Sequence, residues 1–133
     1  MQESDIELFN DSIERCSSRP EFLSRFYTLF VSSSETVARK FEHTDLKKQA
    51  RMLKISLYIM MLTSGESEHS AQLERLAKRH SRSELDINPE LYDLWLEKLL
   101  QAVKEADPKF TGSTEAAWRR LLQPGIDYMK ARY

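Results

Sequence analysis

One histidine in this sequence occupies a position where the helical pattern calls for an apolar side chain. Leu73, Leu76, Ala77 and His80 recur at intervals of three, one and three residues, which places all four on one face of a helix. An imidazole that points into a core needs a partner for its ring nitrogens, because burying them unpaired is unfavourable. That partner is a backbone carbonyl, a buried water molecule or a metal ion. From this stretch alone, a hydrogen-bonded core histidine is the more common outcome, and metal ligation is the alternative.

Other patterns associated with catalysis or metal binding are missing from the sequence. It contains no glycine-rich phosphate loop, no His-Glu-x-x-His pattern and no convincing catalytic triad. Its three histidines, His43, His69 and His80, are too scattered along the chain to predict a histidine metal cluster. The single cysteine, Cys16, excludes an internal disulfide and a zinc cluster built from cysteines. A dedicated hydrolytic site is therefore not expected.

Length, charge and hydropathy narrow the class of protein. A chain of 133 residues, 41% of them hydrophobic, is sufficient for one domain with a real core, expected to span residues 1–133. A formal net charge of −1 predicts no binding to nucleic acid. The acidic, polar start of the chain does not resemble a signal peptide, and the longest apolar run, residues 55–62, is too short to span a membrane. We expect a soluble, cytoplasmic protein that does not bind membranes.

The apolar residues repeat at helical spacing along the whole chain, and no segment shows convincing strand alternation. Serine, proline and glycine residues mark the ends of the expected helices. The first four expected helices cover residues 5–16, 20 to the serines at 32–34, 35–40, and 45–63, the last of these after an N-cap at Thr44. The fifth ends at His80, and the sixth covers residues 89–106. The seventh extends from an N-cap at Ser113 to Met129. A loop surrounds Gly65, and Pro124 with Gly125 should kink or interrupt the last helix. The sequence predicts an all-α domain of about seven helices.

The helix at residues 45–63 is unusual because apolar residues occupy much of its circumference. They include Leu46, Met52, Leu53, Ile55, Leu57, Ile59, Met60 and Met61. A helix that is apolar on most sides is normally packed against other helices on those sides. We therefore expect this helix to be wrapped by the rest of the domain.

The order of these features resembles the globin family, and more closely its single-domain bacterial haemoglobins. The resemblance covers nearly the whole chain. It depends on Phe26-Tyr27 in the second helix, Phe41 fifteen residues after Phe26, Gln49 on the next long helix, Arg79-His80 closing the one after, and Ala117-Trp118 in the last helix. The resemblance implies a globin-like fold.

The resemblance also implies a role for each matching residue. In that family the histidine matching His80 is the proximal ligand of haem iron, and the phenylalanine matching Phe41 stacks on the porphyrin. The residues matching Tyr27 and Gln49 point at the bound gas, and the one matching Leu53 belongs to the apolar distal wall. Neutral imidazole suits the role given to His80, since one nitrogen binds iron while the other donates to a nearby carbonyl. For Tyr27, the alternative is a hydroxyl that reaches the surface.

Further haem contacts are expected from Leu76, Tyr92 and Trp95, although the corner between His80 and Tyr92 is longer than in similar bacterial globins. Lys48 and Arg51 would flank the pocket and pair with the haem propionates, or simply be solvated. A shift of one residue at the helix start would put Lys48 in place of Gln49 and Met52 in place of Leu53. We prefer Gln49, because Leu46, Ala50, Leu53 and Leu57 then share the inward face.

These expectations combine into one functional prediction and one rival. The resemblance implies a haem b globin that reversibly binds dioxygen or another diatomic gas such as CO or NO. Storage, sensing through a signalling partner, and NO detoxification with a separate reductase all remain open, and enzyme activity by the chain alone is not expected. The rival is a globin fold without haem that serves as a signalling or interaction module.

Overall fold

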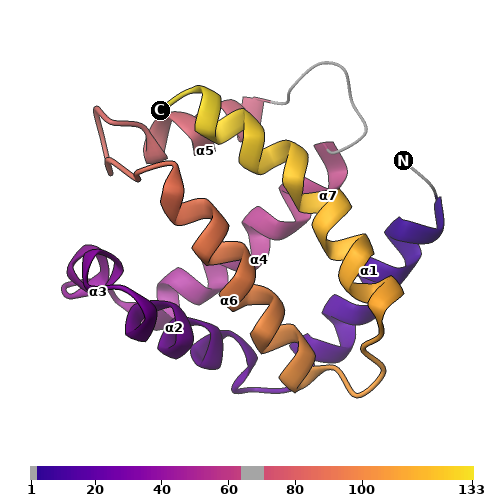
Figure 1. Ribbon diagram of the computed structural model, residues 1–133. Helices are drawn as coiled ribbons and strands as arrows, with labels where there is room; N and C mark the ends of the chain where they lie inside the picture. The colour runs from indigo at the N-terminus through magenta and orange to yellow at the C-terminus, as the bar shows by residue number, and fades with distance from the viewer. Residues whose placement is uncertain (1–2, 64–70) are drawn as a thin grey trace.

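The computed structural model describes residues 3–63 and 71–133 (Figure 1). Within these residues the chain forms seven α-helices and no strand. The helices are α1 (Glu3–Ser17), α2 (Phe22–Ser33), α3 (Glu35–Phe41), α4 (Leu46–Thr63), α5 (Ala71–His80), α6 (Glu90–Ala106) and α7 (Gly112–Ala131). The predicted all-α class with about seven helices is confirmed. The loop expected around Gly65, and His69, lie outside the described residues.

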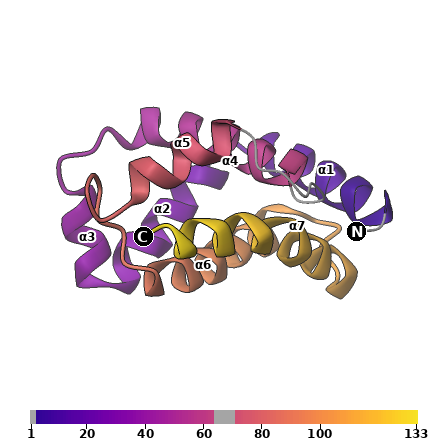
Figure 2. The same ribbon diagram turned by 90° about the horizontal axis from the view of Figure 1, so that it is seen from above.

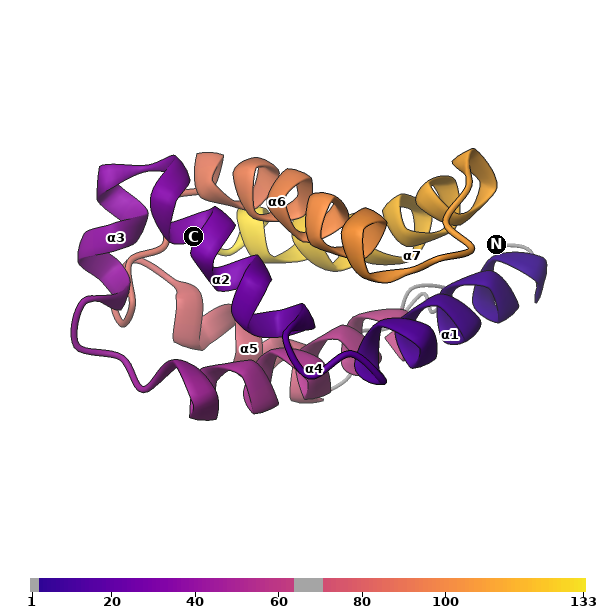
Figure 3. The same ribbon diagram turned by 90° about the horizontal axis from the view of Figure 1, so that it is seen from below.

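The helices form two sides that meet over a shared core. Figures 2 and 3 both place α6 and α7 on one side of the molecule and α1, α4 and α5 on the other, with α3 at one end. The most extensive packing is between α1 and α7 and between α2 and α6, and α4 and α5 also pack against α7. Large side chains from both sides are fully buried between them, among them Phe9, Phe26, Leu57, Leu99 and Trp118.

A buried polar network fastens α1 to the corner between α6 and α7. The Asp107 carboxylate accepts hydrogen bonds from Ser12 Oγ at 2.7 Å and from Arg15 Nε at 2.6 Å. Trp118 Nε1 donates to Ser12 Oγ at 2.9 Å, and the amide of Lys109 donates to Asp107 at 2.9 Å. Because each of these buried polar atoms has a partner, the network holds α1 in place without leaving an unpaired group in the core.

The N-caps of two helices differ by one or two residues from the sequence prediction. Asp45, rather than Thr44, accepts hydrogen bonds from the first amides of α4. The last helix begins at Gly112 after a capping box formed by Thr111 and Thr114, rather than after an N-cap at Ser113. In both cases a residue one or two positions away, whose side-chain oxygen also accepts from a helix amide, is the cap, so the sequence pattern placed the helix start but not the individual residue.

The predicted interruption at Pro124 and Gly125 does not occur, since α7 continues through both residues to Ala131. Pro124 is exposed, so water can bond the carbonyl of Arg120 that its missing N–H leaves free. Gly125 is buried against α4, and a Cβ atom there would lie 2.9 Å from Met60 Cε. The glycine therefore allows α7 to approach α4 closely at this point.

The prediction that α4 is wrapped by other helices is wrong for one of its faces. Leu53 and Leu57 point into the core, as expected. On the opposite side, the exposed fractions are 46% for Met52, 62% for Ile55 and 68% for Leu62. Residue type and helical spacing place these apolar side chains on one face of α4, but they could not show whether another segment covers that face. No helix in the described part of the chain is both long and apolar enough to cross a membrane.

Candidate functional site

His80 is the last residue of α5, and its ring is held by a hydrogen bond within that helix. Nδ1 lies 2.8 Å from the carbonyl oxygen of Leu76, one turn earlier. A carbonyl can only accept, so Nδ1 must carry the proton and Nε2 keeps its lone pair. Burial lowers the pKa of His80 below its ordinary value, and the nearby charge of Arg79 acts in the same direction, although the bond to Leu76 opposes both. The ring is therefore neutral, with one nitrogen fixed and the other ready to bind a ligand.

The free nitrogen of this ring faces accessible space. No described residue forms a hydrogen bond with Nε2, and the described chain contains no buried side-chain polar atom without a partner. The ring of Tyr92 lies beside the imidazole, with 6.4 Å between the ring centroids. Burial raises the pKa of Tyr92 to about 12, so its phenol stays neutral. Burial beside an aromatic ring favours the neutral form of the imidazole over the charged form.

Tyr27, Phe41 and Gln49 are brought together from three different helices. The rings of Tyr27 and Phe41 meet edge to face, with centroids 5.6 Å apart. The Tyr27 hydroxyl is buried rather than at the surface, and it donates to the backbone carbonyl of Gln49 at 3.4 Å. Phe26 and Phe30 extend the cluster, with centroids 4.8 Å from Tyr27 and 6.0 Å from Phe41 respectively. A buried phenol thus points toward the first turns of α4 from within an aromatic cluster.

Burial differs between the two registers considered for α4, and Leu46, which was expected on the inward face, is 39% exposed. Leu53 is buried and Gln49 is half-buried, whereas Lys48 and Met52 are exposed. Gln49 and Leu53 therefore lie on the side of α4 that faces the core. The side chain of Arg51 is also exposed, and neither Lys48 nor Arg51 forms an ion pair with a described acidic residue.

The first turns of α6 connect the histidine with the aromatic cluster. Tyr92 contacts the ring of His80, and Trp95, three residues later, lies with its ring centroid 6.4 Å from that of Phe26. Trp95 is half-buried, as is Leu76, whose carbonyl holds the histidine. Since residues three apart lie on the same side of a helix, α6 presents one aromatic ring to each part of the candidate site.

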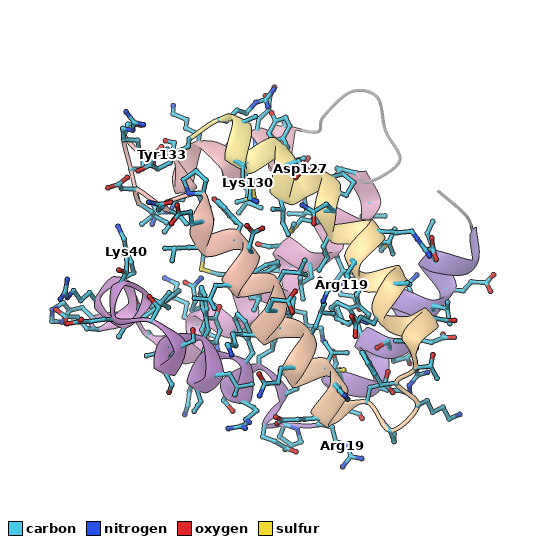
Figure 4. The ribbon with its side chains drawn as sticks, in the orientation of Figure 1. Arg19, Lys40, Arg119, Asp127, Lys130 and Tyr133 are labelled. Atoms are coloured by element: carbon cyan, nitrogen blue, oxygen red, sulfur yellow. The ribbon has the colours of Figure 1, made fainter. Side chains whose placement is uncertain are left out.

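A set of contacts that sequence reasoning did not find holds the corner after His80. Lys40, next to Phe41, donates from Nζ to the carbonyls of Leu85 at 3.0 Å and Asp86 at 2.9 Å. The Tyr133 hydroxyl donates to the carboxylate of Asp86. Figure 4 shows Lys40 reaching from α3 toward this corner and Tyr133 beside it at the end of the chain. These contacts join positions more than forty residues apart, so no local pattern could have indicated them.

Elsewhere the described chain offers no competing site of this kind. No three His, Cys, Asp or Glu side chains within residues 3–63 and 71–133 gather as metal ligands. The side chain of His43 is 92% exposed. One surface hollow of about 290 Å³ lies between α5 and α7, and another of about 350 Å³ lies between α2 and α6. None of the residues predicted for the site lines either hollow.

The donor set at His80 fits haem on its chemistry. Haem needs one neutral imidazole nitrogen as an axial ligand, a second nitrogen on that ring fixed by an acceptor, and apolar or aromatic walls. His80 provides the free Nε2, and Leu76 provides the acceptor. Tyr92, Phe41 and Leu53 provide aromatic and apolar surface.

Comparison with known proteins agrees with this description. A family model described as Globin matches residues 24–129. The chain is also similar to a Pseudomonas aeruginosa PAO1 protein whose crystal structure is described as structurally highly homologous to a human hemoglobin. The two share 36% sequence identity with a TM-score of 0.91, over 97% of this chain and 98% of the other. A search of curated proteins found no match.

Proposed function

Because this chain belongs to the globin family, we propose that it binds one b-type haem through His80 and thereby binds dioxygen or another diatomic gas reversibly. The observation that carries this proposal is the state of the His80 ring. Its proton is held on Nδ1 by the Leu76 carbonyl at 2.8 Å, which leaves the Nε2 lone pair available. The similar Pseudomonas protein, described as homologous to a human hemoglobin, supports the same assignment.

The residues around His80 prepare it to hold the cofactor. Bound haem would supply an iron that coordinates a small gas molecule. The bond from Nδ1 to Leu76 fixes both the tautomer and the rotation of the imidazole, and it increases the basicity of Nε2. Burial keeps the ring neutral near pH 7, so no proton has to leave before a metal binds.

On the other side of the proposed pocket, Tyr27 would donate a hydrogen bond to the gas. Its hydroxyl already lies in the aromatic cluster with Phe41, and its present bond to the carbonyl of Gln49 is long, at 3.4 Å. Burial raises the pKa of Tyr27, so the phenol remains a donor at physiological pH. Phe41 and Leu53 would provide apolar contact with the porphyrin, and the Gln49 side chain would be the second polar group near the gas.

The remaining haem contacts belong to the same proposal. Leu76, Tyr92 and Trp95 would pack against the macrocycle, and the exposed Lys48 and Arg51 would pair with the propionates at the protein surface. Turnover of NO would also need electrons from a reductase, since a globin domain supplies none itself. A gas sensor would need a signalling partner that responds to the bound state.

An absorption spectrum of the protein purified with haem available tests the proposal. We expect a red protein whose Soret band shifts when carbon monoxide is added to the reduced form. His80→Gly should lose most of the bound haem and recover it when imidazole is added, because free imidazole can replace the missing ligand. His43→Gly is the matched control and should keep the full spectrum, since His43 is almost entirely exposed.

Two outcomes would contradict the proposal. A wild-type protein that stays colourless and gains no stability from added haem would instead favour a globin fold that acts as an interaction module. A His80→Gly protein that keeps the wild-type spectrum without imidazole would show that another residue binds the iron.

A further inference from the structure

The outward face of α4 carries three exposed large apolar side chains, Met52, Ile55 and Leu62. Among the described residues only two other large apolar side chains are exposed, Leu46 at the start of α4 and Leu85 outside it. Met52, Ile55, Ile59 and Leu62 follow one another at intervals of three, four and three residues, so they form one line along the helix, which we call the outer stripe. It lies opposite the face that enters the core. Ile59 is half-buried, and the other three are exposed.

A line of positive charge runs beside the outer stripe. Lys47, Lys48, Arg51 and Lys54 are all exposed, and we call these four residues the basic edge. The whole of α4 contains no acidic residue. No described acidic side chain forms an ion pair with any of the four. The chain as a whole has a net charge of −1, so this concentration of cations is local to α4.

We propose that the outer stripe and the basic edge together form a docking surface for an acidic amphipathic helix of another protein. The stripe extends over residues 52–62, about 15 Å at the rise of an α-helix. A linear apolar stripe of that length matches a partner helix with apolar residues at intervals of three and four. Lys47 and Lys54, which the proposed haem site does not use, call for carboxylates on the flank of that helix, because complementary charge sets orientation and excludes other partners.

The charges disfavour a second copy of this chain as the occupant. A two-fold contact uses the same patch on both copies. Pairing through the outer stripe would therefore bring two basic edges, eight cations in total, into one interface to which neither α4 contributes a carboxylate. An acidic partner removes this repulsion, whereas a second copy doubles it.

The shape of α4 disfavours a membrane surface. Helices that lie in a bilayer interface usually insert bulky residues such as Trp, Phe and Leu to a depth of about 5–10 Å. Leu53, Leu57 and Met60 hold the opposite face of α4 in the core, so the helix cannot leave the domain to insert. The outer stripe contains no Trp or Phe.

Binding of a defined probe tests the proposal directly. The probe is a fluorescent helical peptide of about 18 residues, long enough to span the outer stripe. It has leucines on one face and glutamates on both flanks, and a second peptide has lysines in place of the glutamates. Fluorescence anisotropy measures binding to the full-length protein. We expect the glutamate peptide to bind, the lysine peptide to bind at least tenfold more weakly, and about 0.5 M salt to remove most of the difference.

Matched variants assign the binding to α4. Ile55→Ser should weaken binding of the glutamate peptide about tenfold, and Lys47→Glu with Lys54→Glu at least tenfold. Leu85→Ser and Lys104→Glu change the same kinds of residue at exposed positions outside α4, and they should stay within twofold of the wild type. All of these side chains are exposed, so helix content and melting temperature should not change.

Several results would overturn the proposal. Failure of both peptides to bind, or equal binding of both, would remove an acidic helix as the partner. A dimer in sedimentation that dissociates on Ile55→Ser would assign the surface to a second copy. Binding to vesicles of phosphatidylserine and phosphatidylcholine that is lost in the α4 variants would assign it to a membrane. None of these measurements depends on haem, so the docking surface and the proposed gas binding can fail separately.

Discussion

Replacing Tyr27 with phenylalanine removes one hydroxyl group from the aromatic cluster and leaves the ring in place. The ring is buried and meets Phe41 edge to face, so Tyr27→Phe should keep the packing of α2 against α3 and α4. Among the described residues, the hydroxyl has one hydrogen-bond partner, the backbone carbonyl of Gln49 at 3.4 Å. The substitution therefore tests what the hydroxyl does, separately from what the ring does.

The two roles open to this hydroxyl differ in expected magnitude. An O–H···O bond is usually about 2.5–3.0 Å long, so the bond to Gln49 is weak and should contribute less than about 1 kcal/mol to the free energy of unfolding. A bond to the partly negative outer atom of bound dioxygen would contribute about 1.5–3 kcal/mol. At about 1.4 kcal/mol for each factor of ten, its loss should speed dioxygen release roughly 10- to 150-fold.

The assay compares dioxygen and carbon monoxide release from haem-loaded wild type and Tyr27→Phe. Carbon monoxide carries less negative charge on its outer atom, so its release should change much less. Because burial raises the pKa of Tyr27, the phenol stays protonated and the difference in dioxygen release should be the same from about pH 6 to pH 9. If dioxygen release changes by less than twofold while the free energy of unfolding falls, the hydroxyl serves only the Gln49 carbonyl and the distal assignment is refuted.

Three further changes test the scaffold and the histidine. Asp107→Asn removes the buried charge that pairs with the half-buried Arg15. It should lower the free energy of unfolding by about 2–4 kcal/mol in urea titrations, and a change below about 0.5 kcal/mol would show that the pair contributes little. Lys40→Met removes both hydrogen bonds to the corner after His80. It should speed the transfer of haem to an apoprotein acceptor several-fold relative to Lys40→Arg. Equal transfer rates for the two variants would mean that the corner does not position the histidine. Burial lowers the pKa of His80 below 6.5, so the unfolded chain binds more protons than the folded one at lower pH. The haem-free protein should therefore lose stability as the pH falls below about 6.5, and His80→Gln should reduce that loss. Identical profiles of unfolding free energy against pH for the wild type and His80→Gln would contradict the inference.

The histidine at the end of α5 illustrates what short-range pattern can establish. Leu73, Leu76, Ala77 and His80 share one face because a helix repeats every 3.6 residues, and this is true wherever the helix packs. The acceptor for Nδ1 also lies within the same helix, one turn earlier. The sequence was therefore sufficient to predict an inward imidazole with a carbonyl available for its second nitrogen. It left open whether the imidazole only forms a hydrogen bond to that carbonyl or also binds a metal. The globin resemblance was needed to favour a ring that does both, with one nitrogen for each partner.

The contacts across the chain could not be read in the same way. Tyr27 meets Phe41 and Gln49, and Ser12 meets Asp107, because of the angles and order in which the helices pack. Those angles follow from side-chain packing over the whole core, which no local spacing encodes.

The outward face of α4 shows most clearly which properties the sequence determines and which depend on tertiary packing. The sequence by itself determined that this helix is apolar on much of its circumference, because residue type and helical period are local properties. Only the tertiary structure decided that Ile55 and Leu62 lie uncovered, since burial depends on which segments the rest of the chain can bring over them. For the same reason, the helices and the inward histidine follow from the sequence, whereas the convergence of the site and the free surface follow from packing.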